Sequence, residues 1–464
     1  MKIRYIFNKG IGLAALSMLS VFASCDDKLD IDPQQSIGSD VALSTPNGVQ
    51  TALIGAYERL QGGQLYGTNM NLVSELLAAS GAELQWSGTF LGYRQLFSKN
   101  MVADNSEATR TWIRAYETIN IANNVIANVG VFEDEAVRDR VLGEALYIRG
   151  ILYFELARFY ALPWSAGNTT TNLAVPLVLK PTQSITSEDN VNRATVAEVY
   201  AQVIEDLNRA KTLLPESNGT RANTYVASAY LARVYMQQAD ANNNADEDYD
   251  KALAEADRVI KSGKYSLVQN YEEAFNNSAN ISEYVFAIQQ NAQSNAGSAN
   301  DGLATFYADF NGIGRGDVDI VPSFVNNLFA ANDERREVFY VDGGGILRNG
   351  KYLDPFANIP VIRLSEMLLI RAEAAVRNGD LVQALADINR IRERADLAPL
   401  LVVTLNDILQ ERKRELVFEG NALHEAKRLM NSVGTIPFNS PKLVLPIPQR
   451  EIDVNPSLTQ NPGY

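Results

Sequence analysis

The chain has 464 residues, a formal net charge of −14, one cysteine and one histidine. So acidic a chain, with no basic cluster, repels phosphates, which excludes nucleic-acid binding. A single cysteine and a single histidine exclude an intrachain disulfide, a thiolate metal site and a zinc site built on two or three histidines. We therefore expect no metal and no cofactor. The length of the chain is sufficient for one large core or for two lobes.

The first 24 residues have the pattern of a bacterial export signal. Basic residues precede an uncharged apolar run over residues 11–23, which is shorter than the roughly 20 residues that a membrane-spanning helix needs. The run ends in FASC, which is similar to the lipobox where bacterial lipoproteins are cut and acylated, although Phe22 stands where leucine is usual. We predict a signal peptide over residues 1–24 and acylation of Cys25.

Residues 25–44 contain the acidic, proline-containing sequence DDKLDIDPQQS. Such a composition is typical of a solvated tether and argues against the alternative, an inert thiol of Cys25 in a packed core. Several acyl chains on one residue would anchor the protein stably to a membrane.

Helical periodicity dominates residues 45–262. Apolar residues recur at helical spacing in NGVQTALIGAYERLQG, in EATRTWIRAYETINIANNVIANV and in EAVRDRVLGEALYIRGILYFELARFYAL, which ends before Pro163. A second group of helices follows Thr195, a predicted N-cap. These helices predict an N-terminal helical part over residues 45–262.

Two segments are internally alike, ALAEADRVI at residues 252–260 and ALADINRIR at residues 384–392. Each follows a helix rich in small residues. Helix pairs with small residues at close-packing positions resemble tetratricopeptide repeats, in which each pair buries its face on the next.

The helical pattern fades between about residue 263 and residue 360. SEYVFAIQQ predicts a strand, and NAQSNAGSANDGLATFYADFNGIGRGDVD predicts long loops, which often carry binding sites. We interpret the glycines of GIGRGD as turn residues, because no phosphate-binding motif surrounds them. The predicted fold is mostly α, with tetratricopeptide-like helix pairs as a scaffold, a loop-rich ligand-binding region and few short strands.

Two stretches offer the mixture of flat aromatic and polar side chains that sugar rings need, since a ring has an apolar C–H face and a polar edge. They are QWSGTFLGYRQLF and NDGLATFYADFNGIGR. The candidate ligand-binding residues in them are Trp86, Tyr93, Arg94, Phe306, Tyr307, Phe310, Asn311 and Arg315.

The first stretch has an alternative interpretation. Its aromatic residues at 86, 90, 93 and 97 are spaced four, three and four apart, as on the core-directed face of a helix. Gly88 and Gly92 weaken that helix, since each costs about 1 kcal/mol. In the second stretch, we expect that adjacent Phe306 and Tyr307 do not both point into one core.

Charged residues on the later helices are interpreted first as solvated helix faces with intra-helix ion pairs, and otherwise as a surface for a partner. They are Arg371, Glu373, Arg390, Arg392 and Arg394, together with the charged residues of ERKRELVFEG. We expect His424 to lie at the surface or partly buried on a helix. Without a G-x-S-x-G sequence it does not indicate a serine hydrolase.

Several of these motifs, in this order, resemble the SusD/RagB family of outer-membrane nutrient-binding lipoproteins. They are CDDKLDIDP, ALIGAYERL, WIRAYETINIANNVI, EALYIRGILYFELARFYALP, IPVIRLSEMLLIRAEAAVRNGDLVQALADINRIRERADL and the closing LPIPQREIDVNPSLTQNPGY. The chain departs from the family's pattern after VFEG. Leu423, His424 and Glu425 stand there in place of an aromatic residue and an aspartate.

The resemblance implies four tetratricopeptide-like helix pairs and a C-terminal part, residues 263–464, packed with the first part as one unit. It implies a lipid-anchored protein on the outer membrane that faces the exterior and binds oligosaccharides without altering them. It also implies a partner, a SusC-like TonB-dependent transporter, over which the protein sits as a lid.

Three other functions remain open. One is a RagB-like variant that binds peptides. Another is a surface glycoside hydrolase, which needs only two suitably spaced carboxylates. The third is a repeat scaffold that binds only protein partners. Most carboxylates lie on predicted amphipathic helices and no pair stands out in a loop, so we expect a binding protein and not an enzyme.

Overall fold

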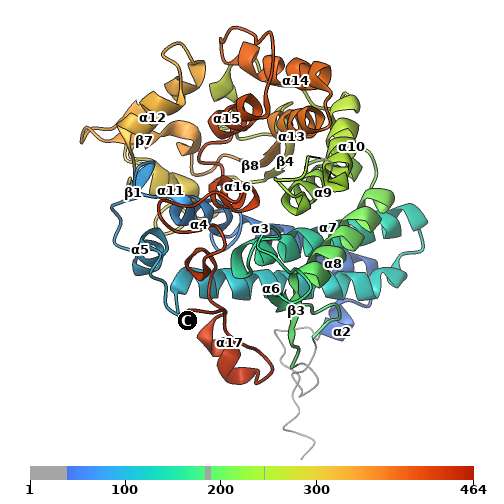
Figure 1. Ribbon diagram of the computed structural model, residues 1–464. Coiled ribbons are helices and arrows are strands. Elements are labelled where there is room, and N and C mark those ends of the chain that lie inside the picture. The colour runs from blue at the N-terminus through green and yellow to red at the C-terminus, as the bar shows by residue number, and fades with distance from the viewer. Residues whose placement is uncertain (1–38, 183–189, 245) are drawn as a thin grey trace, which may run out of the picture.

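The computed structural model describes residues 39–182, 190–244 and 246–464. The predicted signal peptide, Cys25 and most of the predicted tether lie outside the described residues. Within the described residues the fold is mostly helical, with four small two-stranded sheets (Figure 1). This confirms the predicted fold class of many helices and few short strands. None of the described helices is both long enough and apolar enough to cross a membrane.

The helices form a continuous series in which each packs against the next. The order is α3 (Pro46–Gln61), α6 (Ser106–Asn128), α7 (Glu135–Tyr160), α8 (Val196–Leu213), α9 (Thr224–Gln238), α10 (Glu247–Lys261), α13 (Leu364–Arg377), α14 (Leu381–Arg394) and α15 (Leu405–Glu415). In Figure 1 the series rises from α6, α7 and α8 to α13 and α14. The internally alike segments lie in α10 and α14, which pack against α9 and α13.

Local sequence explains where two of these helices begin and end. Thr195 is the N-cap of α8, as predicted, and exchanges hydrogen bonds with Glu198 in a capping box. Helix α7 ends at Tyr160, ahead of Pro163. Its Gly150 lets α8 approach closely, because a Cβ there would lie 3.2 Å from Leu207.

Two excursions leave the helical series and carry all of the described strands except β2 and β3. The first, between α3 and α6, contains α4 (Asn69–Ala78), β1 (Leu84–Trp86) and α5 (Leu91–Ser98). The second, between α10 and α13, contains η4 (Tyr271–Ala274), β4 (Tyr284–Ile288), α11 (Leu303–Tyr307), β5 (Val318–Ile320), α12 (Pro322–Leu328), η5 (Glu334–Val338), β6 (Phe339–Val341), β7 (Leu347–Asn349), η6 (Gly350–Tyr352) and β8 (Ile359–Arg363). The strand predicted from SEYVFAIQQ is β4, which is buried throughout and pairs with β8.

The short elements that remain lie at the N-terminus, along α6–α8 and in the C-terminal segment. They are α2 (Ser39–Ala42), η2 (Val129–Val131), β2 (Leu173–Pro176), β3 (Arg193–Thr195), α16 (Ala422–Arg428), η7 (Pro441–Leu443) and α17 (Gln449–Val454). Helix α16 packs on α4. The chain after Leu443 passes the end of α7, where the Leu445 amide donates to the Phe159 carbonyl at 2.8 Å. The C-terminus is thereby fixed to the N-terminal helices.

The interpretation of the later charged residues as solvated is wrong at three positions. Arg371, Glu373 and Arg394 are buried, whereas Arg390 is exposed. Most of their ion-pair partners come from other segments: Asp387 for Arg371, Arg428 for Glu373, and Glu283 and Glu415 for Arg394. Glu373 also makes a predicted intra-helix pair, with Arg377 at 3.2 Å. In ERKRELVFEG, Glu411, Arg412 and Glu415 are also buried. The reason is that α13 and α15 are covered on more than one side by neighbouring helices.

His424 is a core residue and not a surface residue. It is 2 % exposed on α16, and its ring meets the edge of Phe159 at a centroid distance of 4.9 Å. Burial, followed by the charges of Arg158 and Lys427, holds its pKa well below the usual value. The imidazole is therefore neutral near pH 7.

Candidate functional site

The fold brings the two stretches chosen from the sequence together. Strand β1 of the first excursion pairs with β5 of the second, so that Trp86 lies opposite Val318. The Phe306 ring lies 5.1 Å from the ring of Tyr93 and 5.9 Å from that of Trp86, measured between centroids. The candidate residues therefore belong to one region, although no local pattern in the sequence predicts their contact.

Four of the eight candidates lie in the interior: Trp86 is 8 % exposed, and Tyr93, Phe306 and Tyr307 are fully buried. Trp86 belongs to a strand and not to the alternative helix, because α5 begins only at Leu91. The Tyr93 hydroxyl donates to Asn69 Oδ1 at 2.7 Å. These four side chains are packed in the interior below the surface of this region.

The expectation about the adjacent pair in α11 is wrong, because both rings are buried. Phe306 packs against Tyr93 and Trp86, whereas Tyr307 packs against Tyr352 with 5.3 Å between ring centroids. The short helix has packed side chains on two sides, so successive residues point into different parts of the interior.

The other four candidates, Arg94, Phe310, Asn311 and Arg315, are exposed. Arg94 donates to the Gly88 carbonyl at 3.1 Å. The Arg315 guanidinium lies over the ring of Phe90 at 4.9 Å and pairs with Asp317 at 3.0 Å. This surface therefore presents guanidinium groups beside a partly exposed aromatic ring.

A glycine-rich turn carries Phe310 to the surface. Phe310 and Ile313 exchange backbone hydrogen bonds of 3.0 and 2.9 Å, and Asn311 has a φ of 52°. A Cβ at Gly314, whose φ is +80°, would lie 2.0 Å from the Ala308 carbonyl oxygen. The interpretation of GIGRGD as turn glycines is confirmed, and the turn leaves Phe310 42 % exposed.

Phe310 forms one wall of a cleft of about 390 Å³. Tyr340 of β6 lies beside it, with the two rings nearly perpendicular and 5.6 Å apart. The Asp309 amide donates to the Tyr340 hydroxyl at 3.0 Å, which fixes that ring. The other lining residues are Glu272, Glu273, Phe275, Asn276, Glu337, Val338, Gly350 and Leu353.

Sequence reasoning missed Tyr340. The available signal was its place in EVFYVDGGG, where an aromatic residue precedes a glycine-rich turn. The cleft combines exposed rings with carboxylate oxygens, which suits a ligand that has both apolar faces and hydrogen-bonding groups. The described residues hold no group of three or more His, Cys, Asp or Glu side chains placed to bind a metal ion.

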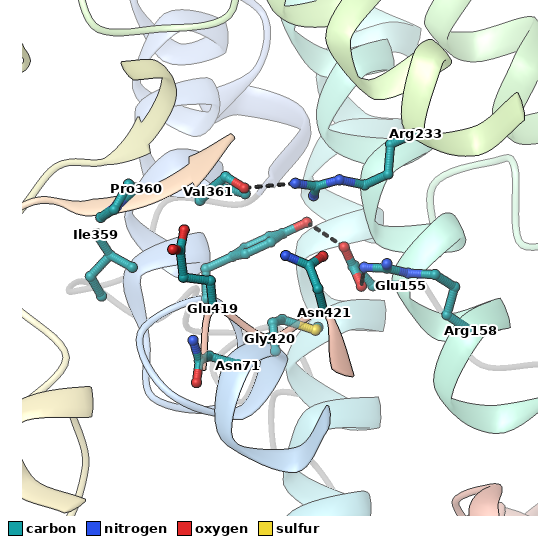
Figure 2. Close-up of a pocket in the computed structure, with 12 residues that line it drawn as sticks. Asn71, Glu155, Arg158, Arg233, Ile359, Pro360, Val361, Glu419, Gly420 and Asn421 are labelled. Carbon is teal, nitrogen blue, oxygen red and sulfur yellow. Dashed lines mark hydrogen bonds and ion pairs between the residues drawn. The ribbon is translucent and has the colours of Figure 1, made fainter. Parts of the chain in front are cut away.

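A second cavity, between the N-terminal helices and β8, is too small for a sugar ring. Its volume is about 30 Å³, which is room for about one water molecule. Figure 2 shows Arg233 pointing to the Val361 carbonyl, to which it donates at 2.8 Å. The Tyr66 hydroxyl donates to Glu155 at 3.3 Å. Arg158 pairs with the same Glu155. These contacts join α9 to β8 and join α7 to the segment that follows α3.

A third hollow, of about 490 Å³, lies between α15 and α16 and is lined by a mixture of aliphatic and polar side chains. The Lys413 ammonium lies over its Phe324 ring at 5.4 Å. The buried Glu75 carboxylate at its base accepts from the Gly420 amide at 2.8 Å. Burial raises the pKa of Glu75 to about 7, against the effect of these amides. The hollow lacks the exposed ring pair of the cleft.

Comparison with known proteins places the chain among binding proteins of this fold. A family model described as "Starch-binding associating with outer membrane" matches residues 27–236, and one described as "SusD family" matches residues 355–436. SusD-like protein P2 of Formosa agariphila is 27% identical, over 96% of this chain and 98% of that protein. Starch-binding protein SusD of Bacteroides thetaiotaomicron is 28% identical, over 36% of this chain and 32% of that protein.

Solved structures show the same architecture. A SusD superfamily protein from Bacteroides thetaiotaomicron is similar with a TM-score of 0.80 and 27% identity, over 90% of this chain and 100% of that chain. A putative sugar binding protein from Bacteroides vulgatus has a TM-score of 0.79 and 28% identity, over 90% of this chain and 99% of that chain.

Proposed function

The chain belongs to the SusD/RagB family, and from that premise we propose that it is a cell-surface protein that captures oligosaccharides and delivers them to a SusC-like TonB-dependent transporter. The observation that carries the binding role is the cleft beside Phe310 and Tyr340. It exposes aromatic rings in a protein whose other aromatic clusters are mostly buried.

Binding would use the two faces of a sugar ring separately. The C–H face stacks on the exposed side of Phe310, while the carboxylates at the rim and the Tyr340 hydroxyl take hydrogen bonds with the sugar hydroxyls. Because the Phe310 turn and the Tyr340 ring are held by backbone hydrogen bonds, little conformational entropy is lost on binding.

Within the candidate set we assign two roles. Phe310 lines the cleft and is proposed to contact ligand there. Asn311, Arg94 and Arg315 are exposed but do not line the cleft, and are proposed to contact only parts of a ligand that extend beyond it. Trp86, Tyr93, Phe306 and Tyr307 are buried and are proposed to support that surface from below.

The transporter partnership and the anchor are further parts of the proposal. Acylated Cys25 would hold the protein on the outer membrane, facing the exterior, and the protein would act as the transporter's lid. The family relationship supports this. Detergent extraction followed by affinity purification should recover a large barrel protein with it, and recovery of this protein alone would argue against a stable partnership.

Binding without catalysis is the part most easily tested. Purified protein is screened against neutral, amino-bearing and acidic oligosaccharides for binding and, in the same samples, for new reducing ends. We expect binding without new reducing ends, and weaker binding by Phe310→Ala. Phe356→Ala is the matched control, since Phe356 is 38% exposed but does not line the cleft. New reducing ends from the wild-type protein would favour the glycosidase alternative.

A further inference from the structure

The charged residues that line the Phe310–Tyr340 cleft are all acidic. Glu272, Glu273 and Glu337 line it, and no lysine or arginine does. All three carboxylates belong to exposed residues, and none has an ion-pair partner among the described residues. A ligand that enters this cleft therefore meets negative charge beside the aromatic wall.

Cations beside this wall are already paired with carboxylates, and Arg315 of the Phe310 turn pairs with Asp317 at 3.0 Å. Arg348 is buried and pairs with Asp319 at 2.6 Å and with Asp342 at 2.7 Å. Lys351, which follows the lining residue Gly350, is buried and pairs with Glu419 at 2.7 Å. Neither side chain is free to attract an anion into the cleft.

The negative charge continues beyond the cleft. A neighbouring hollow of about 830 Å³ shares Glu337 with it and is also lined by Asp333, Glu334, Glu393 and Asp396. Two arginines line it as well, Arg336 and Arg394, and Arg394 is paired with Glu283 and Glu415. Burial, and then the charges of Glu337, Asp396 and Glu272, raise the pKa of Glu334. The carboxylates on this side thus act on one another through space.

The aromatic wall favours the same sign of ligand charge. The face of an aromatic ring carries negative potential and attracts an ammonium group, and the attraction is strongest where water is partly displaced. Phe310 offers an exposed face, and its turn holds it beside the carboxylates. The aromatic rings and the carboxylates therefore both favour a cation and disfavour an acidic group.

We propose that the cleft selects oligosaccharides that carry free amino groups, prefers them to neutral ones of the same backbone, and rejects those that carry uronic acids or sulfates. This inference rests on the proposed glycan-binding function and specifies its ligand class.

The test uses three β-1,4-linked hexamers of matched backbone: hexaglucosamine, cellohexaose and the hexamer of glucuronic acid. Calorimetric titration of the purified protein at low and at high salt measures the affinities for the three hexamers. We expect hexaglucosamine to bind most tightly and the glucuronic acid hexamer most weakly. The difference should shrink at high salt, because salt screens exposed charges.

Charge variants connect the preference to the cleft. Glu337→Gln should weaken hexaglucosamine binding roughly two- to fivefold more than it weakens cellohexaose binding, as expected for the loss of one exposed charge pair. Glu133→Gln is the control: it removes the same charge from an exposed residue that does not line the cleft. Circular dichroism melts of each variant verify folding.

The outcomes separate this inference from the function on which it rests. Equal or tighter binding of the acidic hexamer overturns the inference, as does failure of hexaglucosamine to bind or an effect of Glu133→Gln as large as that of Glu337→Gln. Binding of neutral glycans that Phe310→Ala weakens, without any preference for the amine, leaves the glycan-binding function standing and removes only the charge selectivity.

Discussion

At the scale of single residues, Trp86 and Phe310 differ in the environment that the fold gives them. Both are aromatic residues in glycine-containing stretches, yet Trp86 is 8 % exposed and Phe310 is 42 % exposed. Composition identified both as sugar-binding candidates. It could not separate them, because Trp86 is covered by Phe306, which comes from a distant part of the chain.

The difference predicts that substitution by alanine destabilises the fold far more at Trp86 than at Phe310. Trp86→Ala should lower the free energy of unfolding by about 3–5 kcal/mol, since it leaves a cavity between β1 and α11. Phe310→Ala should cost less than about 1 kcal/mol, because a half-exposed ring has fewer packing contacts to lose. Chemical denaturation measures both values. It is monitored by far-UV circular dichroism, because that signal does not depend on the substituted tryptophan. A loss for Phe310→Ala as large as that for Trp86→Ala would show that Phe310 is a core residue.

Glu425 predicts a dependence of stability on pH. Burial alone would raise its pKa, but Arg412 and Arg428 outweigh burial and lower it from 4.5 to about 2. The carboxylate stabilises the fold fully above about pH 4.5, and this contribution, about 1–3 kcal/mol, is lost as the pH falls towards 2. Glu425→Gln should be less stable at pH 7 and should lose less stability over that range. Denaturation curves that show the same loss of unfolding free energy for the variant and the wild type as the pH falls through this range would contradict this.

At the scale of elements, sequence patterns located the helices better than they located buried charge. Thr195 and the proline after α7 signal boundaries through local chemistry, and these boundaries are present. Arg371 and Glu373 follow the same helical spacing as solvated residues, and their burial depends on which helices pack against α13. That packing is a long-range property, so it was not visible in the local pattern.

The C-terminal segment is an element whose role the structure explains. Asn461 is 6 % exposed, and its amide donates to the carbonyls of Tyr160 at 2.9 Å and Leu445 at 2.8 Å. Its oxygen accepts from Arg193 at 2.7 Å. A single side chain thus joins the end of α7, β3 and the C-terminus.

Asn461→Ala should lower the free energy of unfolding by about 2 kcal/mol or more, because buried donors and acceptors lose their partners. Urea denaturation measures this. Asn439→Ala, at an exposed residue of the same C-terminal segment, is the control and should change stability by less than about 0.5 kcal/mol. Equal stability of the two variants would show that the Asn461 contacts contribute little.

At the scale of the whole molecule, a continuous series of helices supports two excursions, and the excursions build the candidate site. The sequence predicted the mostly helical fold, and of the two stretches that it offered as ligand sites the second supplies Phe310 to the cleft. It did not predict the cleft, whose wall needs Phe310 and Tyr340 from separate segments and whose rim needs η4. The packing of η4 against η5 is a long-range contact that brings its lining residues together.

The proposed anchor at Cys25 is also tested at this scale. Cys25→Ala should release the protein from the outer-membrane fraction, because the acyl chains would be lost while the folded part is unchanged. Fractionation of cells, with a carbonate wash of the membranes, measures the distribution. Retention of the variant in the washed membranes would show that acylation is not what holds the protein there.

The central claim is that this protein binds oligosaccharide at the Phe310–Tyr340 cleft and leaves it intact. The most direct measurement is a crystal structure of the protein with an oligosaccharide that binds it in solution. We predict an unbroken glycan with one sugar ring against the exposed face of Phe310 and polar contacts to the carboxylates of the rim. A glycan seated in the hollow between α15 and α16, or one cleaved at its glycosidic bond, would contradict the account.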